Sequence, residues 1–321
     1  MSNEPDVGRA VRVLRRGGLV AFPTETVYGL GADAESDDAL ARLYAVKGRP
    51  TDHPVIVHLG DAGRIDEWAA SVSDAARALT ARFWPGPLTV VVPAAPRVSR
   101  VATGGLDTVG LRVPDHPVAL ALLDAFGGGV AAPSANRFGR VSPTSAGAVV
   151  RDLGGDVDLV LDGGPCSVGV ESTIVDCTAP APVVLRVGGV TLEDLAGVLD
   201  GVPAVGGTTR APGTLPAHYA PNAAVEVVMP DALADRAHEA AAREVRVGVI
   251  ALASDLAGID LPDALVPLAR PVDAAGYAHD LYRALREADE LGLDLVLAVA
   301  PPPDGLGVAV ADRLGRAAAR H

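Results

Sequence analysis

The chain has 321 residues, of which 49% are hydrophobic and 21% are charged, and its formal net charge is -13 at neutral pH. This composition indicates a soluble globular protein of two domains. Residues 1–205 carry 17 basic and 24 acidic residues, and residues 206–321 carry 10 and 16. Because an acidic surface repels a phosphate backbone, this balance argues against a nucleic-acid-binding domain in either half.

The two cysteines, Cys166 and Cys177, are too few for a disulfide framework and lack the spacing of zinc ligands. They predict small buried side chains in a reducing compartment. No apolar run reaches the length that a membrane-spanning helix needs, and we find no secretion signal. We therefore expect a cytoplasmic protein that has no membrane partner.

The first predicted elements are a helix and a strand that lead into a polar segment. Apolar residues recur at helical spacing over 7–14, and an apolar strand follows over 19–22. The segment P-T-E-T-V-Y-G-L-G at 23–31 interrupts the strand with a proline, and we expect Gly29 and Gly31 to form tight turns there. The hydroxyls and the carboxylate of this segment follow the end of a strand, which is a suitable place for binding.

Asp37 is expected to cap the next helix, which runs through Val46 and places Lys47 at its end. Lys47 is the only lysine of the chain, whereas there are 26 arginines. A compact ammonium beside the planar guanidinium of Arg49 suggests a site that needs a point charge. The pattern indicates a pocket for oxyanions such as phosphate, although a surface lysine that survived a bias towards arginine would look the same. At a helix end that faces a water-filled cleft, Lys47 is expected to contribute little to stability.

The remaining elements alternate in the manner of an α/β protein. Strands are expected over 55–59, 88–92, 108–113, 130–132, 183–185, 225–228, 245–252 and 295–299, and helices over 117–126 and 274–290. Thr191 and Asp194 have the spacing of a capping box at a further helix start.

Two clusters of small polar residues adjoin predicted strands. Ser134, Asn136, Ser142 and Thr144 follow one strand, and E-S-T at 171–173 stands at the mouth of another. Asparagine is rare in this chain, so Asn136 carries more weight than usual. Each of these residues alone could also cap a turn by bonding its own backbone.

A stretch rich in glycine and proline over 206–223 has the composition of an interdomain linker. It separates a predicted domain over 1–205 from a smaller α/β domain over 224–321. The linker also contains His218 and Tyr219, which are unusual in a passive tether.

Seven motifs in this order resemble the YrdC-like threonylcarbamoyl-AMP synthases, and together they cover residues 5–200. They are P-T-E-T-V-Y-G-L-G at 23–31, K-G-R-P at 47–50, H-P-V-I-V-H at 53–58, F-W-P-G-P-L-T at 83–89, R-V-P-D-H at 112–116, P-S-A-N with S-P-T between 133 and 144, and E-S-T-I-V-D at 171–176. The linker motif H-Y-A-P at 218–221 resembles the long, two-domain form of the family. In this linker A-P-G-T at 211–214 replaces the usual S-P-G-M, and His53 replaces a residue that is often smaller.

The resemblance implies an N-terminal YrdC-like α/β domain, in which a twisted sheet borders a deep cavity, and a smaller C-terminal Rossmann-like α/β domain. It implies the synthesis of L-threonylcarbamoyladenylate and pyrophosphate from L-threonine, bicarbonate and ATP, as the first step of a tRNA modification. Mg²⁺ is expected on the phosphates of ATP without a dedicated protein metal site. The implied partners are downstream tRNA-modifying threonylcarbamoyl transferases, without direct tRNA binding by this chain.

The resemblance also implies roles for single residues at the matching positions. L-Threonine would be bound by Thr26, His58, Arg112, Ala132 and Ser172. ATP would be bound by Lys47, Arg49, His53, Thr108, Ser134, Asn136, Ser142 and Arg186. Lys47 and Arg49 are the expected catalytic residues, and His218, Tyr219 and Asn222 are the expected lid over the cavity.

Two other functional classes remain open from the sequence. One is an RNA-binding module, which the acidic balance of both halves opposes. The other is a carbamoyltransferase that forms a carbamoyl adenylate from carbamoyl phosphate. Relatives of that type usually carry acylphosphatase-like and zinc-finger segments, and this chain has only two cysteines.

Overall fold

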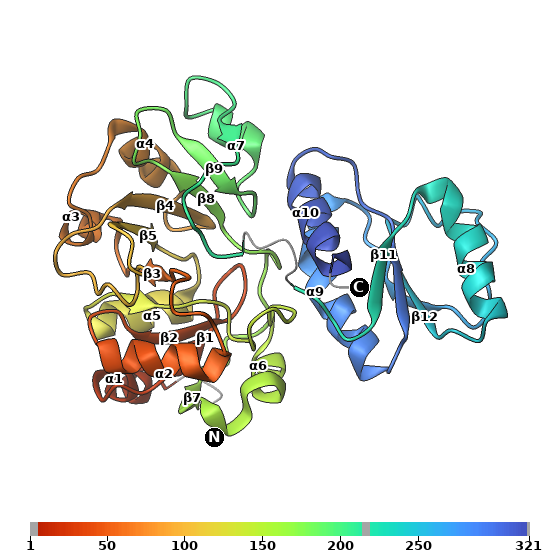
Figure 1. Cartoon of the computed structure of the whole chain (residues 1–321), viewed down its shortest axis with the longest axis horizontal. Helices are drawn as coiled ribbons and strands as arrows, with labels where there is room; N and C mark the ends of the chain where they lie inside the picture. The colour runs from red at the N-terminus through yellow and green to blue at the C-terminus, as the bar shows by residue number, and fades with distance from the viewer. Residues whose placement is uncertain (1–5, 214–218, 320–321) are drawn as a thin grey trace. The chain divides into compact units, whose positions relative to one another are not determined.

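The structure is a computed structural model, and it describes residues 6–213 and 219–319. These residues form two compact units. The first unit comprises residues 6–138, 142–167 and 171–213, and the second comprises residues 139–141, 168–170 and 219–319. Figure 1 shows strands and helices in both units, which confirms the predicted α/β class.

Within the described residues, the first unit is built on a ten-stranded mixed sheet. Its strands, in spatial order, are β10 (Ala204–Val205), β9 (Val183–Arg186), β8 (Thr173–Asp176), β4 (Leu88–Pro93), β5 (Thr108–Arg112), β3 (Ile56–His58), β6 (Val130–Ala131), β2 (Gly29–Asp33), β1 (Val20–Phe22) and β7 (Leu159–Val160). In the centre, β3 runs parallel to β5 and β4 runs parallel to β8, while β4 and β5 are antiparallel.

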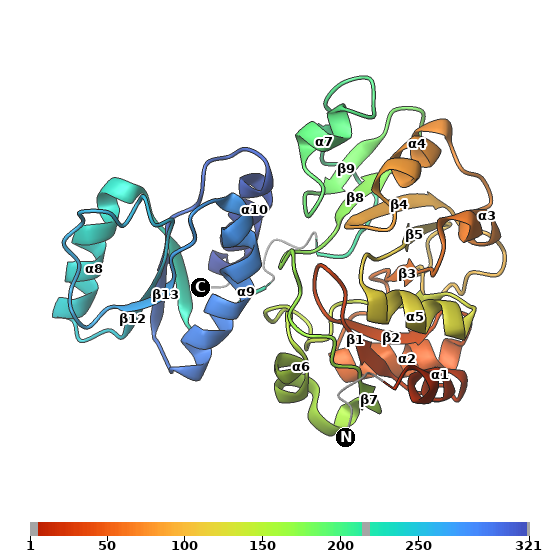
Figure 2. The ribbon, with the colours of Figure 1, turned by 180° about the vertical axis from the view of Figure 1, so that it is seen from behind.

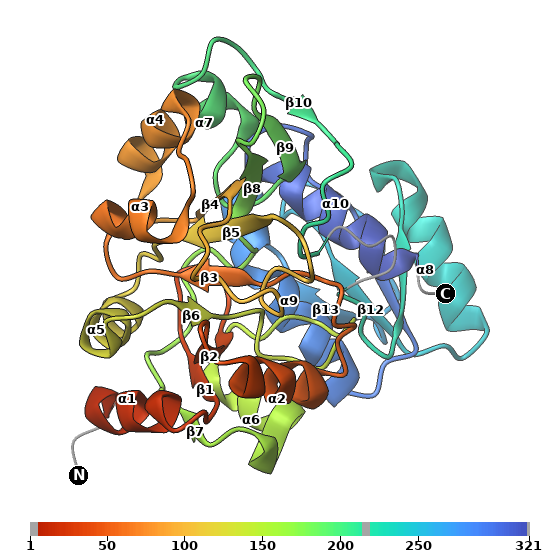
Figure 3. The ribbon, with the colours of Figure 1, turned by 60° about the vertical axis from the view of Figure 1, so that its left-hand side comes forward.

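The helices of this unit are α1 (Val7–Arg15), α2 (Asp37–Lys47), α3 (Ile65–Trp68), α4 (Asp74–Phe83), α5 (Pro117–Phe126), α6 (Ala146–Leu153) and α7 (Leu192–Ala196), with short 3-10 turns at Ala62–Arg64 and Gly154–Asp156. Helices α3 and α4 pack on β5 and β4, and α1 packs against α5, as Figure 3 shows. The predicted helix over 117–126 is confirmed as α5, and the predicted capping box starts α7.

Alternation along the central strands separates two faces of the sheet. Val57, Val90 and Leu111 belong to the main hydrophobic core, which also contains Trp68 of α3 and Leu79 of α4. Their neighbours along the strands point to the opposite face, where Ile56, Val91 and Ile174 form a small apolar cluster of their own. Ala211, from the beginning of the Gly/Pro-rich segment, packs on this cluster.

The predicted turns at Gly29 and Gly31 are wrong, because both residues belong to strand β2. A side chain at Gly31 would meet Val130 at 2.8 Å and Phe22 at 2.9 Å. The glycines therefore allow β2 to lie closely between its neighbouring strands. A second difference is the cap of α2, which is Ser36 and not Asp37, since the side chain of Ser36 accepts the N–H of Ala39.

The described part of the second unit contains a parallel sheet with the strand order β11 (Ala224–Val227), β14 (Leu295–Ala298), β12 (Val247–Ile250) and β13 (Val266–Ala269). Its helices are α8 (Leu233–Ala242), α9 (Ala274–Glu290) and α10 (Leu306–Ala318), preceded by a 3-10 turn at Pro230–Ala232. Figure 2 shows α9 and α10 next to each other. This arrangement confirms the smaller Rossmann-like domain and the predicted helix over 274–290.

None of the helices in the described parts of the chain combines the length and the apolar composition needed to cross a membrane.

Candidate active site

The predicted site residues of the first unit lie mostly at strand ends and in the loops that follow them. His58 and Arg112 are the last residues of the parallel strands β3 and β5, and they stand opposite each other in the register. Ser172 directly precedes β8, whose partner β4 contributes Thr89. Because side chains alternate along a strand, His58 and Arg112 share the sheet face of Ile56, opposite the main core.

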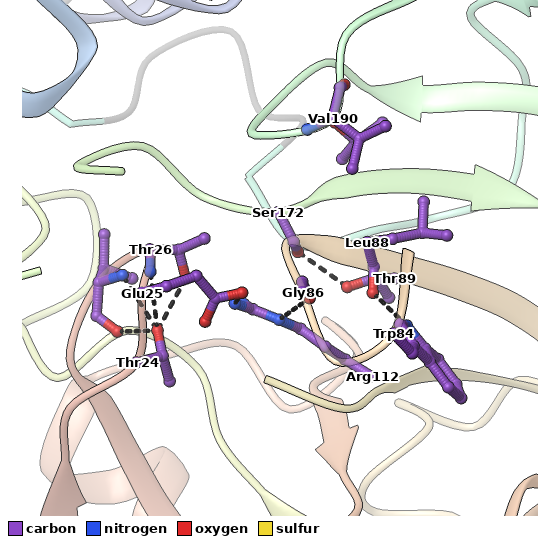
Figure 4. A network of polar contacts seen from close by, with 12 residues as sticks. Thr24, Glu25, Thr26, Trp84, Gly86, Leu88, Thr89, Arg112, Ser172 and Val190 are labelled. Atoms are coloured by element: carbon purple, nitrogen blue, oxygen red, sulfur yellow. Dashed lines mark hydrogen bonds and ion pairs between the residues drawn. The ribbon is translucent and has the colours of Figure 1, made fainter. Parts of the chain in front are cut away.

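Arg112 is buried and makes one hydrogen bond and one ion pair (Figure 4). Its Nε donates a hydrogen bond to the carbonyl oxygen of Gly86 at 3.3 Å, and its Nη2 lies 2.7 Å from Oε1 of Glu25. The prediction from sequence missed Glu25 as the partner of Arg112. One signal was present, since Glu25 is the only charged residue between Gly17 and Ala32.

Thr26 is fully buried and is held by a local hydroxyl network. The hydroxyl of Thr24 lies 2.8 Å from that of Thr26, donates to the carbonyl of Val27 at 2.6 Å, and accepts the N–H groups of Thr26 and Val27 at 3.2 Å. This turn fixes the backbone on both sides of Glu25.

His58 is a neutral imidazole at physiological pH. Burial and, next, the positive charge of Arg112 lower the pKa of His58 to about 3. Its ring stands edge-on to Phe22, with the ring centres 6.0 Å apart. A neutral imidazole in such a place can accept or donate a hydrogen bond without adding charge.

Ser172 and Arg186 form a second buried network. The hydroxyl of Ser172 lies 2.8 Å from that of Thr89 and accepts Nη2 of Arg186 at 3.2 Å. Arg186 also donates to the carbonyl of Ser172 through Nε and Nη2, at 3.1 and 2.8 Å, and to the carbonyl of Pro212 through Nη1 at 2.9 Å. Arg186 thus connects Ser172 with the start of the Gly/Pro-rich segment. Thr89 is a further residue that the prediction from sequence missed.

Lys47 is almost entirely buried, with 2% of its surface exposed. Its Nζ donates to the carbonyl oxygens of Ser134 and Asn136, at 2.5 and 2.6 Å. Burial and, next, the charge of Arg49 hold the pKa of Lys47 well below its ordinary value. The expectation that Lys47 faces a water-filled cleft, where it would contribute little to stability, is therefore wrong.

Arg49 and His53 both contact the ring of Phe138. Arg49 donates to the carbonyl of Pro54 at 2.8 Å and lies 5.7 Å from the ring centre of Phe138. The ring of His53 stands edge-on to the same phenyl ring at 5.8 Å. The N–H of Phe138 also donates to the carbonyl oxygen of Lys47 at 2.8 Å, so the three basic residues form one cluster around Phe138.

The other predicted ATP-binding residues belong to the same unit. Ser142 is buried and donates to Oε1 of Glu171 at 2.8 Å, and Asn136 donates to the carbonyl of Arg137 at 2.8 Å. Thr108 begins β5 and lines a small pocket over the second face of the sheet. The pocket is lined by Pro54, Val55, Ile56, Thr89, Val91, Leu106, Thr108, Gly110, Ile174, Arg210, Ala211 and Pro212.

Ala132 lies just past β6 and is buried, and its N–H donates to the carbonyl of Ile56 at 2.9 Å. Ser134 forms an isolated bridge with Gly29. These contacts attach the P-S-A-N loop to β2 and β3, the two strands that adjoin β6.

The three expected lid residues are distributed differently. His218 lies outside the described residues. Tyr219 has a positive φ of 62° and is buried in the second unit, where its ring stacks on Tyr282 at 5.7 Å and lies under the guanidinium of Arg313 at 5.1 Å. The side-chain oxygen of Asn222 accepts Nη2 of Arg140 at 2.6 Å. Tyr219 and Asn222 are thus held by residues of the second unit, and their role in a lid stays a prediction.

A metal-binding cluster of three or more His, Cys, Asp or Glu side chains does not occur among residues 6–213 and 219–319.

Comparisons with known proteins agree over the length of the chain. The Sua5_yciO_yrdC family model, described as Telomere recombination, matches residues 12–188, and the model of the threonylcarbamoyl-AMP synthase C-terminal domain matches residues 190–319. The threonylcarbamoyl-AMP synthase of Bacillus subtilis is 40% identical, over 99% of this chain and 94% of that protein. The one from Pyrococcus abyssi is 43% identical, over 96% of this chain and 92% of that protein.

A solved structure is also similar over both units. The crystal structure of P. abyssi Sua5 complexed with L-threonine has a TM-score of 0.89 and 40% sequence identity to this chain, and the match covers 97% of this chain and 94% of that one.

Proposed function

The chain belongs to the threonylcarbamoyl-AMP synthase family, and we propose that it forms L-threonylcarbamoyladenylate and pyrophosphate from L-threonine, bicarbonate and ATP. The observation that carries the proposal is the presence, in one unit, of two kinds of buried cationic site. One is the single guanidinium of Arg112, and the other is the cluster around Lys47 and Arg49. The first suits an amino-acid carboxylate, and the second suits a polyphosphate.

The amino-acid site is proposed to consist of Thr26, His58, Arg112, Ser172 and the backbone at Ala132. Arg112 would hold the carboxylate of threonine, because a planar guanidinium can bind both carboxylate oxygens. The neutral imidazole of His58 and the hydroxyls can bind polar atoms of the substrate without adding charge. Their burial would keep the site dry.

The ATP site is proposed to consist of Lys47, Arg49, His53, Thr108, Ser134, Asn136, Ser142 and Arg186. An ammonium group has three N–H donors, and two of those of Lys47 bond carbonyl oxygens in the described structure. The third could meet a phosphate while the other two keep the P-S-A-N loop in place. Lys47 and Arg49 would then stabilise the charge that develops on the phosphates during the reaction.

The proposed chemistry needs orientation and charge more than a side-chain nucleophile. The amino group of threonine combines with bicarbonate to give a carbamate and water, and a carbamate oxygen attacks the α-phosphorus of ATP while pyrophosphate leaves. Bringing three reactants together is the main contribution of the protein to such a step. Mg²⁺ would bind mainly to phosphate oxygens and water.

We infer the setting of the reaction from its product. A mixed anhydride of a carbamate and AMP is readily hydrolysed, so it has to be passed on to an acceptor, for which we propose a tRNA-modifying threonylcarbamoyl transferase in the cytoplasm. The acidic surface of the chain favours this hand-over to a protein over direct binding of tRNA.

The first prediction tests the reaction itself. Pyrophosphate release from ATP should require L-threonine and bicarbonate together, measured with a coupled assay in which each reactant is omitted in turn. L-Serine should be a weaker substrate and not an inactive one, because a missing methyl group costs only about 1–3 kcal/mol. Turnover that does not depend on threonine would contradict the proposal.

A further inference from the structure

Glu25 is a buried carboxylate that the proposed roles leave unexplained. Only 5% of its surface is exposed, and among the described residues neither carboxylate oxygen accepts a hydrogen bond. Its one ion pair there is the 2.7 Å contact with Arg112, whose side chain is buried to the same extent. Figure 4 shows the carboxylate beside the guanidinium, between the loop of Thr24–Thr26 and Ser172. A buried anion with unused acceptor positions is costly unless something binds to it.

The pair of Arg112 and Glu25 matches the charges of an α-amino acid. In such a substrate a carboxylate and an ammonium are attached to the same carbon atom. A guanidinium that holds the carboxylate therefore brings the ammonium to whatever lies next to the guanidinium, and here that neighbour is the carboxylate of Glu25. A neutral or basic group at this place would leave the substrate ammonium buried without a counter-charge.

On the footing of the proposed function, we propose that Glu25 binds the ammonium group of L-threonine and accepts the proton that this group must lose. Amines react with bicarbonate only as the neutral base. In the first step the N–H bond of the ammonium breaks and its proton forms an O–H bond on Glu25, which leaves a neutral amine and a neutral carboxyl group. In the second step the amine and bicarbonate form the N–C bond of the carbamate and release water.

The substrate itself prepares Glu25 for this step. Before binding, Glu25 is the only carboxylate among the described residues that pairs with the guanidinium of Arg112. When the substrate carboxylate takes part of the same guanidinium, two anions share one cation, and a proton on Glu25 becomes more favourable. Proton transfer is therefore coupled to correct placement of the amino acid.

The titratable groups around Glu25 fit this role. His116, at the start of α5, and Cys166 both interact electrostatically with Glu25. Burial lowers the pKa of His116 and raises the pKa of Cys166 to about 12, so both side chains are neutral at physiological pH. Arg112 is thus the only charged neighbour of Glu25 among these groups.

The test compares Glu25→Gln with the wild type from about pH 7 to about pH 9.5, with kcat/KM for threonine as the readout. The Gln variant keeps the shape of the side chain but accepts no proton. We expect kcat/KM to fall about 100-fold near pH 7 and the deficit to shrink below about tenfold near pH 9.5, where more free threonine already carries a neutral amine. The affinity for ATP, measured without threonine, should stay within about threefold of the wild-type value.

Two further variants separate proton transfer from a structural role. Glu171→Gln removes another buried carboxylate, which is 6% exposed and accepts a hydrogen bond from Ser142, and it should keep the wild-type shape of the pH profile. Glu25→Asp keeps a proton acceptor, so it too should keep that shape at a lower rate. If Glu25→Gln does not fold, Glu25→Asp and Glu171→Gln still give this comparison, and an alkaline rescue of Glu25→Asp as large as that expected for Glu25→Gln would contradict the proposal.

Two results would overturn the proposal for Glu25. One is a kcat/KM of Glu25→Gln within about threefold of the wild type near pH 7. The other is a loss of the same size at every pH, which would mean that Glu25 only positions Arg112. Both are distinct from a failure of the proposed function, in which the wild type itself would release no pyrophosphate in response to threonine.

Discussion

The ammonium group of Lys47 lies between two carbonyl oxygens of the loop that carries Ser134 and Asn136. This position gives the residue two tasks. It holds the loop in place, and it supplies a positive charge beside Arg49 for the proposed phosphate site. An arginine would bring the same charge in a wider, planar head group, which the two short contacts leave little room for.

We predict that Lys47→Ala lowers turnover by about 10²- to 10³-fold, because one preorganised contact to developing charge is lost. It should also lower the free energy of unfolding by about 2 kcal/mol, since the hydrogen bonds from the ammonium group to the carbonyl oxygens of Ser134 and Asn136 are lost. Lys47→Arg should show a substantial fall in turnover as well. Steady-state kinetics and chemical denaturation of both variants are the measurements, and near-wild-type activity in Lys47→Arg would mean that the position needs only a positive charge.

His58 predicts a pH dependence of stability. Its pKa is lowered to about 3 in the folded protein, against 6.5 for an exposed histidine, because of burial and the charge of Arg112. As the pH falls below about 6.5, the unfolded chain takes up a proton at this residue and the folded chain does not. The contribution is therefore fully present above about pH 6.5 and is lost at up to about 1.4 kcal/mol per pH unit down to about pH 3.

The measurement for His58 is the free energy of unfolding at about pH 7 and about pH 5, in the wild type and in His58→Gln, which does not titrate. Between these two values the wild type should lose about 2 kcal/mol more than the variant. Equal losses in the two proteins would show that His58 does not have a lowered pKa.

Among the elements, the segment that follows β10 is attached to the first unit at several points. Nη1 of Arg210 donates to the backbone and side-chain oxygens of Asp52, at 2.8 and 3.1 Å. The hydroxyl of Thr209 donates to Oδ2 of Asp176 at 2.6 Å, and the carbonyl oxygen of Pro212 accepts a hydrogen bond from Arg186. This part of the predicted linker therefore lies over the second face of the sheet and covers its apolar cluster.

We predict that Arg210→Ala loosens this cover without unfolding the unit. The ion pair of Arg210 with Asp52 is partly exposed, so its loss should change the free energy of unfolding by less than about 1 kcal/mol. The fraction of adenylate lost to hydrolysis, measured as the pyrophosphate released in excess of intact product, should rise. Arg243→Ala, which breaks a similarly exposed pair with Glu239 in the second unit, is the matched control. An equal fraction lost in both variants would contradict a covering role.

At the scale of the whole molecule, the domain limits predicted from sequence and the units of the structure differ. Residues 139–141 and 168–170 belong to the second unit, although they lie within the predicted first domain. The first unit continues past residue 205 and includes the described residues up to 213. We propose that this extension and the rest of the linker act together as the lid, with Tyr219 and Asn222 as its attachment to the second unit.

This proposal predicts different behaviour for two truncated chains. The chain of residues 1–205 should fold. Its rate of synthesis should fall or a larger fraction of the intermediate should be hydrolysed, because Ala211 no longer covers Ile56, Val91 and Ile174. The chain of residues 1–213 should keep a higher rate of synthesis and more intact intermediate, since Ala211 still covers the apolar cluster. Circular dichroism and the pyrophosphate and product assays are the measurements. If 1–205 matched the full chain, the linker would be only a tether and the second unit would need another role.

The sequence by itself determined the class of the fold, the family and most of the elements. Proline at the start and a phenylalanine before glycine set the limits of α5, and Thr191 and Asp194 started α7, because caps and helical periodicity depend only on residues a few positions apart. The position of the site residues at strand ends was predictable as well, because the limits of an apolar strand can also be read from neighbouring residues.

Only the tertiary structure decided which of these residues meet. Glu25 and Arg112 are far apart in the chain, and so are Lys47 and the carbonyl groups of Ser134 and Asn136. Gly31 was predicted to form a turn, yet it lies in strand β2. Glycine is needed there because Phe22 and Val130 leave no room for a side chain. The spacing of residues along the chain does not predict such contacts, because they depend on which strands become neighbours when the chain folds.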